Sequence, residues 1–460
     1  MLSIISSSVA TLILVASLSF AQTPASSKND LALLTEAATL LQAGKFDEAE
    51  PLVRRVIAIA PANADAHNLL GTILDQRGQS QAAEREYLEA LRRNPRAISA
   101  RANLGVLLAR TGRPDQAAKT FEALLLEVPG HQEATLNLGL LYANRGDFAR
   151  AIPLLEKARL YKPQNVAVLA NLGIAYYHDQ KIDEALKVLK YAEVLAPGDA
   201  DVQYGLGLVF ASRGDSEAAV LAWQQALLRR EKFAAATFMI GEELRKQSRY
   251  EGAIKYYQRA LEQDPTQLVY YVRLGGTYML MVRHDSALEI FQRAAQLFPK
   301  AAEVRYFVGI AAEGSGNYEI AEAALRKSLE LRKDNVDALA QLGFVLSEKG
   351  RNVEAEQFLR RALATDPRHF YATYHLGRML VRTKRFEEAI GVLVAAAQLR
   401  PRDPSVHYQL FIAYTRLKRT EDAARELAVF KQCDAESKAH GNEDTPLEDT
   451  LRRPADPEKP

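Results

Sequence analysis

The sequence is nearly free of cysteine, and the common signatures of catalysis are absent from it. Cys433 is the only cysteine among 460 residues, so the chain can form no internal disulfide. There is no Gly-x-x-x-x-Gly-Lys-Ser/Thr loop, no His-Glu-x-x-His pair and no Cys-x-x-Cys pair. Gly205-Leu-Gly207 follows a helical pattern, whereas a dinucleotide loop follows a strand. We therefore expect no enzyme activity, no cofactor and no metal site.

An excess of charge of one sign is also missing. The chain carries 59 Lys and Arg against 57 Asp and Glu, which gives a net charge of +2. A protein that binds nucleic acid or a membrane surface is expected to show a basic excess or a basic stripe. The balance of charge favours a protein or peptide as the partner.

Long hydrophobic runs are missing except near the start of the chain. Val9 to Phe20 forms one apolar run of twelve residues, which is short for a bilayer span. Ser19 and Ala21 are small residues at the positions that a signal peptidase reads. We expect residues 1–21 to be a signal peptide that is cleaved after Ala21, which predicts a secreted or periplasmic protein. No Lys or Arg precedes Lys28, so an uncleaved segment that anchors an assembly factor in the membrane stays open.

What the sequence does contain is a strict period. Alanine recurs every 34 residues without a miss, at Ala49, Ala83, Ala117, Ala151, Ala185, Ala219, Ala253, Ala287, Ala321, Ala355, Ala389 and Ala423. A glycine preceded by an aliphatic residue stands twelve positions before ten of these alanines, at Gly71, Gly105, Gly139, Gly173, Gly207, Gly241, Gly275, Gly309, Gly343 and Gly377. Proline follows most of the alanines by twelve residues, and Glu231 and Lys333 replace it in two repeats.

A period of 34 residues is typical of stacked helix–turn–helix units. The recurrent alanine, glycine and proline all fit a single 34-residue frame, which predicts twelve repeats over residues 30–437 after a linker at 22–29. The charged, proline-rich tail at 438–460 is expected to be disordered. Glycine inside a helix costs about 1 kcal/mol relative to alanine, so its recurrence indicates a close helix crossing that admits no larger side chain. Trp223 shares its repeat position with Phe121 and Tyr257, which predicts a core residue.

These repeats resemble the tetratricopeptide repeat (TPR) family. The residues that carry the resemblance are, in one repeat, Leu274-Gly275, Tyr278, Ala287, Phe291, Ala294 and Pro299. The family's tryptophan, three residues before the leucine, is missing, and the first and last repeats fit loosely, as capping repeats do. The resemblance implies an all-α, right-handed superhelical solenoid. It also implies that the first helices line a concave groove, so that the protein acts as a scaffold or adaptor for a protein or extended peptide.

Two rows of side chains on the first helices are candidates for that groove. Three residues before the glycine lie Tyr204, Phe238, Tyr306 and Tyr374, and Tyr408 takes the same place in the last repeat, where Phe411 replaces the glycine. One residue after it lie Val106, Leu140, Ile174, Leu208, Ile310, Phe344 and Ile412. Aromatic side chains dominate the energetics of many interfaces, which favours a binding role. The alternative, that the rings pack on the next repeat, stays open.

Polar candidates lie on the same helices. Asn103, Asn137 and Asn171 precede Leu-Gly in three consecutive repeats, where amides could bond the backbone of a bound peptide. Arg378 and Arg382 could form a basic inner surface, although surface arginine without a partner is the commoner case.

Two other functions stay open at this point. The histidines His369, His375 and His407 lie near the C-terminal end of the array and could meet as a metal site, which is the only support for an enzyme. The array could also be structural and associate with itself.

Overall fold

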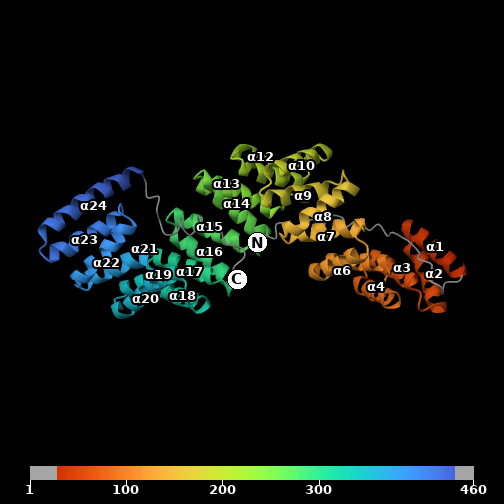
Figure 1. Ribbon diagram of the computed structural model, residues 1–460, viewed down its shortest axis with the longest axis horizontal. Helices are drawn as coiled ribbons and strands as arrows, with labels where there is room; N and C mark the ends of the chain where they lie inside the picture. Colours follow the sequence, from red (N-terminus) through yellow and green to blue (C-terminus); the bar gives the residue numbers. More distant parts are fainter. Residues whose placement is uncertain (1–27, 441–460) are drawn as a thin grey trace. The chain divides into compact units, whose positions relative to one another are not determined.

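The computed structural model describes residues 28–440, and these residues form helices and turns without a strand (Figure 1). The chain divides into two compact units, the first ending at Lys232 and the second beginning at Phe233. Each unit holds six helix pairs. The expected signal peptide at 1–21 and most of the expected tail lie outside the described residues. None of the described helices combines the length and apolar character that crossing a membrane requires.

The first unit contains helices α1 to α12. Their bounds are α1 Lys28–Gln42, α2 Phe46–Ile59, α3 Ala64–Gln76, α4 Ser80–Arg93, α5 Ile98–Arg110, α6 Pro114–Glu127, α7 Gln132–Asn144, α8 Phe148–Tyr161, α9 Val166–His178, α10 Ile182–Leu195, α11 Ala200–Ser212 and α12 Ser216–Arg229. Odd-numbered helices are the first of each pair and even-numbered helices the second.

The second unit continues the same alternation. Its helices are α13 Ala234–Lys246, α14 Tyr250–Gln263, α15 Leu268–Leu280, α16 His284–Leu297, α17 Ala302–Gly314, α18 Tyr318–Leu331, α19 Val336–Glu348, α20 Asn352–Thr365, α21 Phe370–Arg382, α22 Phe386–Leu399, α23 Pro404–Arg416 and α24 Thr420–His440.

The helices follow the phase of the sequence period closely. From the second repeat onward, each first helix starts at the first residue of a predicted repeat, as at Ala64 and Pro404. First helices then have 13 residues, and second helices have 14 apart from α24. α24 has 21 residues and ends three residues beyond the expected array boundary at 437.

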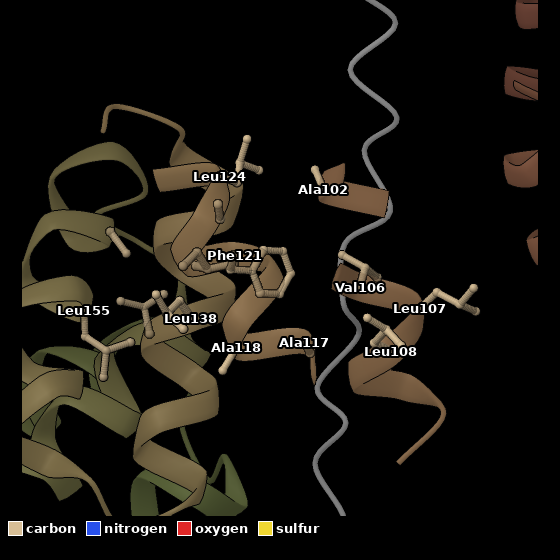
Figure 2. Close-up of a cluster of buried hydrophobic side chains, with 14 of the residues drawn as sticks. Ala102, Val106, Leu107, Leu108, Ala117, Ala118, Phe121, Leu124, Leu138 and Leu155 are labelled. Carbon is tan, nitrogen blue, oxygen red and sulfur yellow. The ribbon is translucent and has the colours of Figure 1, made fainter. Parts of the chain in front are cut away.

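A close crossing inside each pair explains the recurrent glycine. A side chain from the second helix lies over the glycine of the first helix, sixteen residues earlier in the chain. A Cβ placed on Gly105 would lie 2.7 Å from the ring of Phe121, and one on Gly377 would lie 2.6 Å from Leu393. Figure 2 shows the Phe121 ring on α6, pointing toward α5. The recurrent alanines are buried in all twelve repeats, and Trp223 is fully buried, as predicted.

The turn inside each pair places one residue in the left-handed region, where φ is positive. Glycine takes this place in seven turns, among them Gly78 with φ 75° and Gly316 with φ 73°. Five turns use another residue, at Gln180, Ser248, Val282, Lys384 and Lys418. Val282, with φ 58°, is the most strained of these because a β-branched side chain disfavours this region strongly.

In both units, most first helices of successive pairs contact each other, as α9 contacts α11 and α19 contacts α21. Second helices of successive pairs make no comparable contact in the part of the chain that is described. Because the first helices lie closer together, they form the inner side of the curve in each unit. The inner surface is therefore the one on which the groove candidates lie.

We predict that Gly377→Ala destabilises the second unit and that Gly391→Ala stabilises it. Both glycines belong to one repeat, but nothing lies within 4 Å of a Cβ on Gly391. At Gly377, overpacking of about 1–3 kcal/mol outweighs a helix-propensity gain of about 1 kcal/mol. Urea unfolding followed by circular dichroism measures both effects. A Gly377→Ala protein as stable as Gly391→Ala would contradict the close crossing.

We predict that Val282→Gly raises the free energy of unfolding by about 1 kcal/mol. The left-handed conformation costs an L-residue about 1–2 kcal/mol, and the greater freedom of glycine in the unfolded chain offsets part of the gain. The reciprocal change Gly316→Val, at the equivalent position of the next repeat, should lower stability. Equal effects of the same sign would contradict the assignment of strain to this turn.

Candidate partner-binding surface

The row of aromatic residues three positions before the glycine changes from buried to exposed along the chain. Tyr204, Phe238 and Tyr306 are buried, with 1%, 4% and 6% of their surface exposed. Tyr374 is half-buried, and Tyr408 is 43% exposed. Only the last two members of the row therefore present their rings at the surface.

Contacts with neighbouring helices account for the burial of Phe238 in this aromatic row. The ring of Phe238 on α13 stacks on Tyr270 of α15, with 4.7 Å between the ring centres. It also lies 5.5 Å from the ring of Tyr257 on α14. This is the packing alternative that the sequence left open. A charge at Tyr204 or Phe238 is therefore expected to disturb folding, so it offers no clean test of binding.

The row that follows the glycine is more accessible in the second unit than in the first. In the first unit, Val106, Ile174 and Leu208 are buried and Leu140 is partly exposed. In the second unit, Ile310, Phe344 and Ile412 are all partly exposed, on α17, α19 and α23. On α21 the same place holds Arg378, whose guanidinium lies over the Phe344 ring, 5.1 Å from its centre. The inner surface of the second unit thus presents a row of partly exposed apolar and aromatic side chains.

The three asparagines lie on first helices as expected, but their surroundings differ. Asn103 is partly exposed, and its amide Nδ2 donates to Oδ1 of Asn68 at 3.0 Å. Asn137 and Asn171 are buried. The Asn171 amide donates to the Ala167 carbonyl on its own helix at 2.8 Å, and its Oδ1 is buried without a hydrogen-bond partner. Intramolecular hydrogen bonds therefore already engage some of the amide groups that these asparagines would need to bind the backbone of a peptide.

Arg378 and Arg382 share one carboxylate from the preceding repeat. Each donates to Oε1 of Glu348, at 2.8 and 3.1 Å, and Arg382 also reaches Ser347. Burial and the Glu348 carboxylate raise the pKa of the nearby Glu313, while Arg378 acts in the opposite direction. With two carboxylates beside two guanidiniums, the local charge is balanced and the arginines link α21 to α19.

The three C-terminal histidines have separate partners. His369 contacts Asp337 at 3.0 Å, and His407 contacts Glu426 at 2.7 Å. Burial, with the charges of Arg378 and His369, lowers the pKa of His375 to about 3, so this ring is neutral at pH 7. Among the described residues, no group of three or more His, Cys, Asp or Glu side chains is placed to hold a metal ion.

A pocket at the end of the array was not foreseen from the sequence. It has a volume of about 300 Å³ and is lined by Tyr374 on α21, by Pro404, Ser405, Tyr408 and Gln409 on α23, and by Phe430 and Asp434 on α24. The sequence carried one signal for it. Phe430 takes the place at which earlier repeats have a small buried residue such as Ala396 or Ala362.

Comparison with known families agrees with this architecture. A family model described as tetratricopeptide repeat matches residues 34–98, 72–134, 102–161 and 136–200. A model described as the cilia and flagella-associated protein 70 C-terminal domain matches residues 229–446. No curated protein matches the chain by sequence. Six helix–turn–helix repeats in each of the two units define an all-α repeat protein. The chain belongs to the tetratricopeptide-repeat family.

Several solved structures have a similar arrangement of helices. The APC/C hetero-tetramer Cut9–Hcn1 is 16% identical, covers 93% of this chain and 96% of its own, and has a TM-score of 0.48. Yeast Tom70 is 16% identical, with 92% and 99% covered and a TM-score of 0.36. YrrB, described as a TPR protein with an unusual peptide-binding site, is 22% identical, with 41% and 98% covered and a TM-score of 0.35. At these scores and identities, the likeness carries no argument about function.

Proposed function

We propose that the protein is a non-enzymatic scaffold that binds a protein or an extended peptide along the first helices of its second unit. The observation that carries the proposal is the row of partly exposed Ile310, Phe344 and Ile412 on the inner surface. Apolar and aromatic side chains held by rigid helices supply contact area with little loss of conformational freedom on binding.

The charges of this surface favour a polypeptide over a nucleic acid. Binding to phosphates relies on basic side chains whose charge is available, and Arg378 and Arg382 are already paired with Glu348. A polypeptide needs no such excess, because it can combine apolar contacts with hydrogen bonds to its backbone. The row of partly exposed apolar side chains on the second unit would supply the apolar contacts.

We predict that Ile310→Glu with Ile412→Glu abolishes peptide binding while the protein stays folded. The measurement is a selection of displayed random peptides on the wild-type protein, followed by titration of the selected peptides against each variant. The matched control is Leu331→Glu with Val353→Glu, which adds the same charge at exposed apolar positions of the second helices α18 and α20. Peptides that bind the double variant as tightly as the wild type would refute the proposed surface.

We also propose that the scaffold acts in the cell envelope or is secreted. The support is the sequence pattern of residues 1–21, with small residues at Ser19 and Ala21. We predict that the mature protein from its native source begins at Gln22, as N-terminal sequencing would show. A mature chain that retains Met1 and fractionates with membranes would favour the membrane-anchored assembly factor instead.

A further inference from the structure

The pocket at the end of the array combines aromatic walls with a carboxylate. The rings of Tyr408 on α23 and Phe430 on α24 lie 5.3 Å apart, centre to centre, at an angle of 46°. Tyr374 forms a third aromatic wall, and Asp434 adds the carboxylate. The volume of about 300 Å³ lies at the small end of the range for ligand sites.

The repeat pattern explains why the aromatic ring is exposed at this end of the row. In an earlier repeat, the ring of Phe238 three residues before the glycine packs on Tyr270 of the next first helix. No further repeat follows α24 among the described residues, so Tyr408 remains 43% exposed. Phe430 replaces the usual alanine and enlarges the aromatic surface at the same place.

The surrounding charges favour a positively charged occupant. Asp403 and Asp434 lie at or next to the pocket, and Asp403 caps the first turn of α23 through the Ser405 N–H. The nearby Arg402 lies 3.9 Å from Glu436, and Arg378 is held by Glu348. Burial together with Glu436 and Asp403 raises the pKa of the adjacent Cys433 thiol, with Arg402 acting in the opposite direction, in keeping with acidic surroundings.

We propose that this pocket binds the cationic side chain of a lysine or arginine. The rings of Tyr374, Tyr408 and Phe430 line the pocket and attract a cation through their ring electrons, and the Asp434 carboxylate, which also lines the pocket, pairs with it. The inference rests on the proposed function in one respect, since the side chain is assigned to the bound polypeptide. The pocket itself can be tested without that polypeptide.

The first experiment measures binding of Nα-acetyl-lysine methylamide to the full-length protein by saturation-transfer NMR. Nα-acetyl-norleucine methylamide, which has a similar hydrocarbon chain without the ammonium group, is the ligand control. We expect the lysine compound to bind about five-fold more tightly, because the cation–π contact and the Asp434 carboxylate both act on the ammonium group, which norleucine lacks. Equal binding of both compounds would overturn the assignment of a cation.

Variants locate the binding. Tyr408→Ala and Asp434→Asn should each weaken lysine binding several-fold. The matched controls are Tyr191→Ala, a tyrosine 44% exposed on α10, and Glu421→Gln, an exposed carboxylate in the first turn of α24 and outside the pocket. Both controls should bind as the wild type does. Lysine binding that survives Tyr408→Ala and Asp434→Asn would place the cation elsewhere and overturn the proposal, provided that circular dichroism shows both variants folded.

A second experiment separates this inference from the proposed function. Selected peptides should carry a Lys or Arg whose replacement by norleucine weakens binding to the wild type but not to Asp434→Asn. Peptides that depend on Ile310 and Ile412 but are indifferent to Asp434 would refute the pocket and leave the scaffold standing. Lysine binding in the pocket without any peptide that depends on Ile310 and Ile412 would support the pocket and count against the scaffold.

Discussion

The structure depends on one contact, repeated in ten of the twelve helix pairs. A glycine on the first helix leaves room for a buried side chain from the second helix, sixteen residues later. That side chain is aromatic in some repeats and leucine in others, as Phe121 and Leu393 illustrate. Because the glycine leaves room for either side chain, the helix crossing is preserved although the residue that packs there varies. The recurrent buried alanine keeps the second helix close in the same way.

The close pairs lead to the functional surface. In each unit, most successive first helices contact each other. Their side chains that point away from the second helices therefore lie together on the inner surface. In the second unit this surface carries Ile310, Phe344 and Ile412, partly exposed and held by rigid helices. At the end of the array the same geometry opens the pocket around Tyr408, where none of the described helices follows to cover the ring. Packing and the proposed binding therefore use equivalent positions, and whether a position is buried depends on its neighbours.

This dependence sets how much could be predicted from the sequence. The period of Gly377 and its equivalents predicted the helix pairs, the first residues of the helices and the reason for the glycine, because these are properties of one repeat. The burial of Phe238 could not be predicted, because it depends on Tyr270 in the next repeat. The neutralisation of Arg378 depends likewise on Glu348 in the preceding repeat. A repeat read alone defines its own fold but leaves open which of its side chains a neighbour will cover.

The short connections between helices also constrain how such a chain can change in length. From α3 to α4 three residues intervene, and from α4 to α5 four, with the same spacing kept up to the start of α24. One extra residue inside a helix would turn everything after it by about 100°, which would carry the glycine and alanine away from the crossing. Gain or loss of a whole 34-residue block leaves every crossing intact. Growth by duplication of entire repeats is therefore the change that this architecture accommodates most readily.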